Sequence, residues 1–221
     1  MSRLNLLFTK GGLQYQVADR AVLEENTLVT EMGDSNNELP ALLRRILEKN
    51  VSEIRVISAL NHFTVMPEGF NDHDRGYDLI ALNAAVDREN EELMLSVNKK
   101  FGVQFYYTLP KVIYSEIKAK NNSATFNFSG EKFLNSLQTR GNKEIHINLY
   151  HHQCEFFALN NKKVQLYNNL DVDAEVDFLY FIMFTMSKLG FSAAETNFYV
   201  YGETTENETF ISELRKFVKN L

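Results

Sequence analysis

The chain of 221 residues carries a formal net charge of -6, with 44% hydrophobic and 24% charged residues, which is typical of a folded globular protein and excludes extensive disorder. The acidic balance argues against nucleic acid or a membrane surface as a partner, because both require clustered Lys and Arg in excess. A single cysteine, Cys154, excludes an internal disulfide, and Met1 to Leu7 do not resemble a secretory signal, so we expect a cytoplasmic protein without a membrane anchor.

The beginning of the chain predicts three strands and a helix. Residues 4–8 and 13–17 alternate apolar and polar side chains around the Lys10-Gly11-Gly12 turn, which indicates a hairpin. A third strand is expected within residues 22–29. Apolar residues at helical spacing then predict a helix over residues 39–47.

The middle of the chain predicts a mixture of short strands and helices. The expected strands cover residues 53–58, 63–67, 93–97, 103–107 and 124–128. One helix is expected over residues 75–85, with Tyr77, Leu79, Ile80 and Leu82 facing inward. Pro110 is expected to open another, carrying Val112, Ile113 and Ile117, and a short helix with Phe133, Leu134 and Leu137 is expected to end near Gly141.

From Gly141 on, the order of strands and helices predicted for the beginning of the chain is repeated. Strands are expected over residues 145–149, 154–159 and 164–167, followed by a polar turn at Asn168-Asn169, a helix over 174–189, a strand over 197–202 and an amphipathic helix carrying Phe210, Ile211, Leu214, Phe217, Val218 and Leu221. This approximate internal repeat predicts two halves, residues 1–140 with inserted strands and helices, and residues 141–221.

Two aromatic features bear on how the halves are covered. Residues 178–184 are apolar or aromatic without interruption, so the helix that contains them is expected to be buried on every side, although it is too short to span a bilayer. In the pairs Tyr106-Tyr107 and Phe156-Phe157, neighbouring strand residues face opposite ways. One member of each pair therefore points away from the main core unless a second layer covers it.

A meander of three strands, then a helix and a strand, used twice, is the plan of the ribonuclease H-like halves of actin-like ATPases. Several segments also resemble a bacterial domain-of-unknown-function family, numbered thirty-eight twenty-two: VQLYNNL (164–170), DFLYF (177–181), YVYGE (199–203), VMPEGF (65–70) and FYYTLP (105–110). The resemblance implies an α/β protein of duplicated ribonuclease H-like halves, the actin-like ATPase fold, without an established biochemical activity. It also leads us to expect that a closing strand after the last helix is missing.

Actin-like ATPases hold nucleotide with two hairpin turns that each contain Asp-x-Gly, and with glycines at the end of a later strand. Here the turn at Lys10, Gly11 and Gly12 has no acid, the turn at residues 148–153 has neither acid nor glycine, and only Gly202 remains at the strand end. We therefore expect no cofactor. If ATP and Mg²⁺ do bind, the resemblance assigns the contacts to Lys10, Gly11, Gly12 and Gly202.

The sequence gives little support for a zinc site, a catalytic cysteine or a two-metal nuclease site. His146, His151, His152 and Cys154 are residue types that bind zinc, but His151 and His152 point to opposite faces if they lie in a strand. Cys154 begins a Phe-rich strand, where packing is its expected role. The predicted strands carry almost no carboxylates, which a two-metal nuclease would need. We expect His62 and His73 to lie in solvated loops, and we expect no metal site or catalytic residue.

The sequence favours a non-catalytic cytoplasmic protein of actin-like fold, with degenerate nucleotide-binding motifs, that binds another protein or itself. The alternative is a divergent ATP-binding protein or ATPase that uses the cleft between the halves. Binding of nucleic acid is a third hypothesis, which the acidic balance disfavours.

Overall fold

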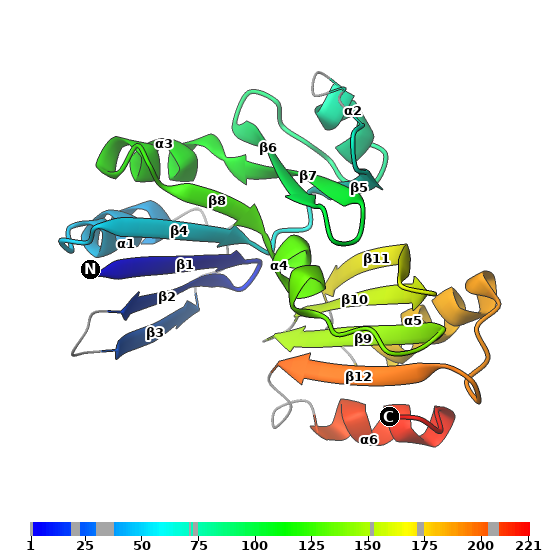
Figure 1. Ribbon diagram of the computed structural model, residues 1–221. Helices are drawn as coiled ribbons and strands as arrows, with labels where there is room; N and C mark the ends of the chain where they lie inside the picture. The colour runs from blue at the N-terminus through cyan, green and yellow to red at the C-terminus, as the bar shows by residue number, and fades with distance from the viewer. Residues whose placement is uncertain are drawn as a thin grey trace. The chain divides into compact units, whose positions relative to one another are not determined.

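The computed structural model describes residues 2–18, 23–29, 38–70, 72, 75–150, 153–171, 175–202 and 208–221. The chain divides into two compact units, Met1–Lys132 and Phe133–Leu221 (Figure 1). Each unit has a sheet that begins with three antiparallel strands and then adds a strand parallel to its first. The internal repeat is therefore confirmed at the level of topology, and the boundary at residue 140 stays a prediction.

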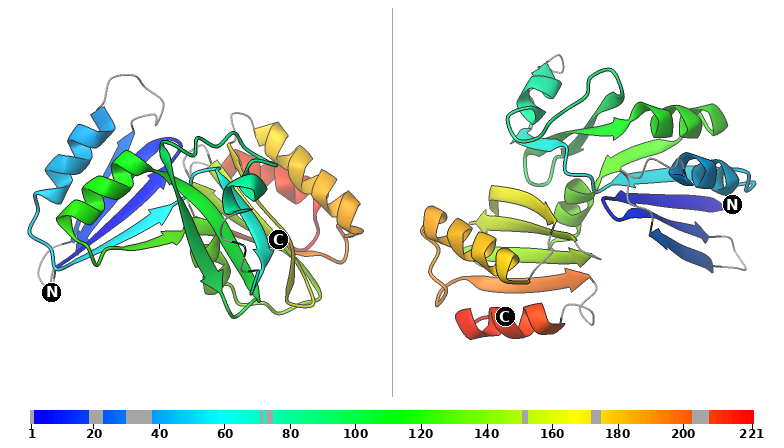
Figure 2. Two further views of the ribbon diagram at one scale, coloured as in Figure 1. Left: turned by 90° about the horizontal axis from the view of Figure 1, so that it is seen from above. Right: turned by 180° about the vertical axis from the view of Figure 1, so that it is seen from behind.

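The sheet of the first unit has the order β3-β2-β1-β4-β8. Its strands are β1 (Arg3–Thr9), β2 (Gly12–Ala18), β3 (Leu23–Val29), β4 (Glu53–Ser58) and β8 (Thr125–Phe128). Two helices, α1 (Glu38–Leu47) and α3 (Lys111–Lys120), lie side by side on one face (Figure 2). Leu4, Leu6 and Phe8 alternate along β1 and are buried against this layer, together with Leu43 and Ile113. Val112, which lies on the same helix as Ile113, is half exposed.

A three-stranded sheet with the order β5-β7-β6 is inserted between β4 and β8. It consists of β5 (Phe63–Pro67), β6 (Glu91–Asn98) and β7 (Val103–Pro110), with the short helix α2 (Gly76–Ile80) beside it. The prediction of a helix to residue 85 was wrong, because regular structure stops at Ile80 and Leu82 is 78% exposed. His62, expected in a solvated loop, has its Nδ1 atom 3.0 Å from Oε2 of Glu91. His73 lies outside the described residues.

The sheet of the second unit has the order β11-β10-β9-β12. Its strands are β9 (Lys143–Tyr150), β10 (Gln153–Asn160), β11 (Lys163–Asp171) and β12 (Asn197–Gly202). Helix α5 (Glu175–Leu189) crosses one face and α6 (Glu208–Phe217) lies along β12 (Figure 2). Phe178 of α5 meets Phe210 of α6 at 4.1 Å between ring centroids, above Ile145 and Ile147 of β9. Phe217, which we expected to pack inward, is exposed at the end of α6.

The polar turn predicted at Asn168-Asn169 is instead part of β11. Asn168 pairs with Phe156 of β10 and Asn169 pairs with Glu155. Asn169 is buried, and its Oδ1 accepts a hydrogen bond from Nε2 of Gln153 at 3.3 Å. A polar side chain can continue a strand when a neighbouring strand supplies its partner, and residue type alone did not reveal that partner.

Both aromatic pairs are buried on both sides, so the condition of a second covering layer is met. Phe156 lies in the core under α5, whereas the Phe157 ring contacts Phe133 at 5.7 Å and Tyr167 at 4.5 Å. Phe133 belongs to α4 (Ser129–Ser136), which ends before the predicted end near Gly141. In the first unit, Tyr106 and Tyr107 are likewise both buried.

Candidate functional site

Three of the four predicted nucleotide contacts lie together in the turn between β1 and β2. Lys10 is exposed, and Gly11 has only the Thr9 hydroxyl within 4 Å of the position where a Cβ would stand. Gly12 is buried with φ at 131°, a conformation that disfavours other residues. The Thr9 hydroxyl donates to the Gly12 carbonyl at 3.3 Å. The turn therefore needs Gly12 for its own geometry, and contact with nucleotide stays a prediction.

The fourth residue, Gly202, ends β12 in the second unit. Its φ is 85°, and a Cβ there would overlap the carbonyl oxygen of Leu149 on β9. Glycine is thus required where β12 and β9 approach each other. In the second predicted turn, residues 148–150 belong to β9 and Gln153 begins β10, whereas His151 and His152 lie outside the described residues.

A buried polar cluster on β9 and β12 was not predicted. Glu144 and His146 are both fully buried on one face of β9, and Tyr199 and Tyr201 lie beside them on β12. The expectation that the strands carry almost no carboxylates was wrong for the second sheet, where Glu144 on β9 and Glu155 on β10 are both 0% exposed. The spacing of two between Glu144 and His146 was the available signal that they share a face.

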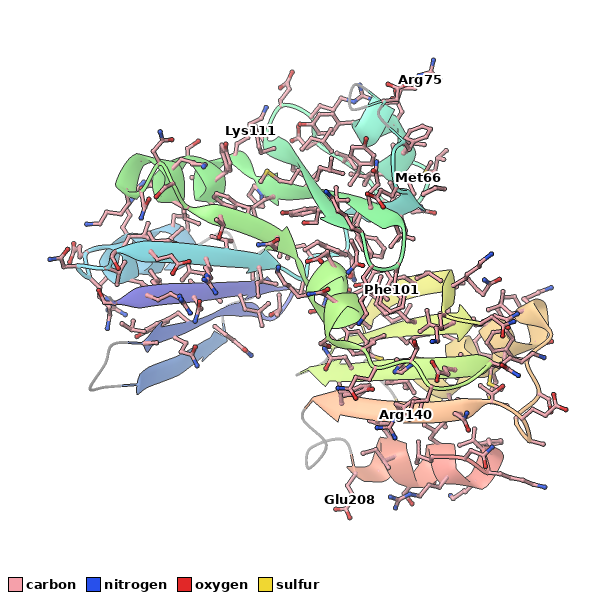
Figure 3. All side chains as sticks on the ribbon, in the orientation of Figure 1. Met66, Arg75, Phe101, Lys111, Arg140 and Glu208 are labelled. Atoms are coloured by element: carbon pink, nitrogen blue, oxygen red, sulfur yellow. The ribbon has the colours of Figure 1, made fainter. Side chains whose placement is uncertain are left out.

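The cluster forms a chain of hydrogen-bonding groups. Oε1 of Glu144 accepts backbone N–H groups from Arg140 and Gly141, each at 2.6 Å (Figure 3 labels Arg140). His146 lies between Oε2 of Glu144 at 3.3 Å from Nε2 and the hydroxyl of Tyr201 at 3.1 Å from Nδ1. Its ring also stacks on Tyr199, with centroids 4.7 Å apart. Burial lowers the pKa of His146, and the Glu144 carboxyl opposes this shift.

The second buried acid is also held by internal partners. Glu155 accepts from Nδ2 of Asn148 at 2.9 Å and from the Tyr167 hydroxyl at 2.7 Å. Neighbouring Cys154 is buried in the core under α5, and burial raises the pKa of its thiol well above the ordinary value. Over the described ranges, no group of three or more His, Cys, Asp and Glu side chains is arranged to hold a metal ion.

The buried His146 predicts that stability falls in mild acid. Because its pKa is below the ordinary 6.5 in the folded state, the unfolded chain binds more protons as the pH drops. The contribution is fully present above about pH 6.5 and is lost as the pH falls through the folded pKa, by at most about 1.4 kcal/mol per pH unit. Urea unfolding between pH 7 and 5 should show this slope.

A matched pair of variants assigns that slope to one residue. His146→Gln should flatten the dependence of unfolding free energy on pH between 7 and 5, whereas Tyr201→Phe, which keeps the histidine, should retain it. Equal slopes in His146→Gln and the parent would show that another group titrates.

A groove of about 650 Å³ runs along the outer side of β12. It lies between this strand and α6, whose first residue, Glu208, is labelled in Figure 3. The lining residues are Phe198, Tyr199, Val200, Tyr201, Glu208, Ile211, Arg215 and Leu221. The groove therefore presents a strand edge, apolar side chains and one charge of each sign.

An aromatic surface on α5 is the second unpredicted feature. Tyr180, Phe181 and Phe184, which we call the α5 aromatic surface, are 62%, 41% and 47% exposed. The expectation that this helix is covered on every side was wrong, since these three rings are exposed while Phe178, Leu179, Ile182 and Met186 of the same helix lie in the core. Within the described segments, no helix has the length and apolar character needed to cross a membrane.

Solved structures share this fold. A protein of actin-like ATPase fold and unknown function from Bacteroides thetaiotaomicron VPI-5482 is 18% identical over 99% of this chain and 89% of its own, with a TM-score of 0.79. A PilM–PilN type IV pilus biogenesis complex matches at 10% identity over 99% of this chain and 86% of that chain, with a TM-score of 0.58. The predicted actin-like ATPase fold is therefore confirmed.

A search of curated proteins finds no match. The family described as "Protein of unknown function (DUF3822)" matches residues 2–221, which is nearly the whole chain. The resemblance noted from the sequence is confirmed, and the chain belongs to this family.

Proposed function

We propose that this chain is a non-catalytic protein of actin-like ATPase fold that acts in the cytoplasm by binding another protein through the α5 aromatic surface. The observation that carries the proposal is the exposure of Tyr180, Phe181 and Phe184 on consecutive turns of one helix. Aromatic side chains grouped on a surface commonly mark an interaction site. They also dominate the binding energy of protein interfaces when a partner buries them.

The three rings form one contiguous patch with a charged border. The Tyr180 ring lies 5.7 Å from Phe181 and 5.9 Å from Phe184, measured between centroids. Nζ of Lys188 lies 5.2 Å from the centroid of the Phe184 ring, and exposed Asp177 precedes the patch on the helix. An apolar centre with a polar rim is the usual anatomy of a protein interface.

A solved structure of similar fold also supports the proposal of protein binding. The PilM–PilN structure is described as a complex, so a protein of similar fold is known in association with a different protein. The hydrogen-bonding of Glu144 and Glu155 within the second sheet adds a second argument, because neither carboxyl group is held out toward a ligand.

Removal of the α5 aromatic surface tests the proposal. The double variant Tyr180→Ser/Phe184→Ser should change the unfolding free energy by less than about 1 kcal/mol, because both rings are largely exposed. In its native cells, the double variant should no longer crosslink to the protein that crosslinks to the parent chain. The matched control is Phe217→Ser, which removes an equally exposed ring from α6 and should keep that partner.

Two measurements decide the outcome of this test. Mass spectrometry of the crosslinked product identifies the partner, and sedimentation velocity shows whether it is a second copy of the chain. A double variant that retains the same crosslink and the same sedimentation as the parent would contradict the proposal.

The alternative, a divergent nucleotide-binding protein, is supported by the fold and by exposed Lys10 on a glycine turn. Titration calorimetry with Mg-ATP at millimolar Mg²⁺ should show no saturable heat if our proposal is correct. If heat appears, Lys10→Ala and Gly11→Ala are the informative variants, because Gly11 has no strained φ and a Cβ there would make only an ordinary contact with the Thr9 hydroxyl at 3.8 Å. Saturable heat that both variants abolish would establish the alternative.

A further inference from the structure

The exposed side of α5 carries a straight row of four side chains, which we call the α5 stripe. Its members are Asp177, Phe181, Phe184 and Lys188. They follow one another at intervals of four, three and four residues, the spacing that keeps side chains along one seam of a helix. All four are exposed, and Tyr180 lies beside the row, with its ring centroid 5.9 Å from that of Phe184. A second helix that lies on this surface therefore contacts the α5 stripe along its length.

The α5 stripe is complementary to itself when it is read in the opposite direction. It has an acid at one end, a base at the other and two phenylalanine rings between them. When a second copy of α5 lies antiparallel on the first, Asp177 of each copy comes opposite Lys188 of the other. In the same register Phe181 comes opposite Phe184, because both pairs have the same midpoint on the helix. A two-fold dimer needs such a self-complementary surface, and the α5 stripe provides it.

The charges favour the antiparallel direction over the parallel one. A parallel pair would place Asp177 opposite Asp177 and Lys188 opposite Lys188, and like charges repel. Antiparallel helices also bring the partly positive N-terminus of one copy beside the partly negative C-terminus of the other. Within the described residues neither Asp177 nor Lys188 forms a salt bridge, so both charges are available to a partner. Nζ of Lys188 lies 5.2 Å from the centroid of the Phe184 ring, which keeps that charge next to the aromatic part of the stripe.

We propose that the α5 stripe pairs with the α5 stripe of a second copy of this chain, antiparallel and about a two-fold axis. The inference rests on the proposed function, because it names the protein that the α5 aromatic surface binds. The exposed parts of the three rings of that surface amount to about 300 Å² per copy, less than half of the roughly 800 Å² that each partner buries in a standard interface. We therefore expect a weak, reversible dimer with a dissociation constant of about 10–500 μM.

Reversal of the two charges tests this pairing by sedimentation velocity. The parent chain should show a monomer–dimer equilibrium over this concentration range. Asp177→Lys and Lys188→Asp should each weaken the dimer at least about tenfold, because each creates two like-charge contacts across the two-fold axis. The double variant Asp177→Lys/Lys188→Asp should associate within about threefold of the parent, because both pairs form again with their signs exchanged. An equimolar mixture of the two single variants should also dimerise, since one then has two positive ends and the other two negative ends.

The double variant separates pairing from the stability of α5 itself. Asp177 lies in the first turn of the helix and Lys188 in the last, where each stabilises the helix through its dipole. Both reversals therefore destabilise α5, and the double variant most, so a restored dimer cannot come from a more stable helix. Phe181→Ser should weaken self-association at least about tenfold, whereas Phe217→Ser, at an exposed ring of α6, should change it less than about twofold.

Three results would overturn the pairing of two α5 helices. They are a parent chain that stays monomeric over the whole concentration range, a dimer that neither single reversal weakens, and a double variant that associates no better than the single variants. The proposed function fails on a different result, a crosslink that Tyr180→Ser/Phe184→Ser retains. A monomeric parent whose crosslink to a different protein is lost in that variant would keep the proposed function and overturn the pairing.

Discussion

Replacement of Gly202 with alanine is expected to destabilise the second unit by about 3 kcal/mol or more. Two costs combine at this position. The φ of 85° disfavours any residue with a Cβ, and that Cβ would also overlap the Leu149 carbonyl oxygen and lie within 3.0 Å of its backbone nitrogen. Relief of the overlap requires β12 to move away from β9, which breaks the pairing that holds the end of the sheet. Urea unfolding followed by circular dichroism measures the loss.

Gly190→Ala is the matched control for this prediction. Gly190 follows α5 in the same unit and has φ at 65°, but nothing lies within 4 Å of its Cβ position. Its replacement should cost about 1 kcal/mol, from the backbone conformation alone. Equal losses in the two variants would show that the contact with Leu149 is relieved without disturbing the sheet.

The backbone conformations of Gly12 and Gly202 limit how the predicted nucleotide contacts can be tested. Gly12 and Gly202 were selected from the resemblance as possible phosphate or nucleoside contacts. Both have backbone conformations that the sheets themselves require. Loss of ligand binding in a Gly202→Ala variant would therefore not distinguish a lost contact from a distorted strand, which is why Lys10 and Gly11 are the better positions.

The strands were predictable where one face of a sheet is buried against helices. Leu4, Leu6 and Phe8 on β1, and Ile145, Ile147 and Leu149 on β9, alternate with less apolar residues and enter the cores. The prediction failed for Asn169, because a buried amide in a strand depends on a partner from the neighbouring strand. Its partner Gln153 lies 16 residues earlier in the chain.

The exposure of α5 was not predictable from its sequence. Residues 178–184 contain no polar residue to mark the solvent side, so periodicity cannot separate Phe178 in the core from Phe181 and Phe184 on the surface. The contact between His146 and Tyr201 in the polar cluster was not predictable from the sequence either. His146 meets Tyr201, 55 residues further along, through the pairing of β9 with β12, and only the tertiary structure brings them together.

Replacement of the buried Glu155 with methionine is expected to cost about 3 kcal/mol, although methionine is apolar and similar in length. The reason is the two donors left behind. The Tyr167 hydroxyl and the Asn148 amide both donate to Glu155, and a buried donor without an acceptor costs about 1–3 kcal/mol. Chemical denaturation of the purified variant, monitored by tyrosine fluorescence, measures the change.

A double-mutant cycle separates the hydrogen bond from the burial of the carboxyl group. Tyr167→Phe alone removes one donor and should cost about 1–2 kcal/mol. Adding it to Glu155→Met removes the orphaned hydroxyl, so the double variant should be more stable than the sum of the single losses by about 1–2 kcal/mol. Strict additivity would mean that the 2.7 Å contact between Tyr167 and Glu155 contributes nothing to stability. In that case the acid would be held mainly by Asn148, and Asn148→Leu would replace Tyr167→Phe as the variant that couples to it.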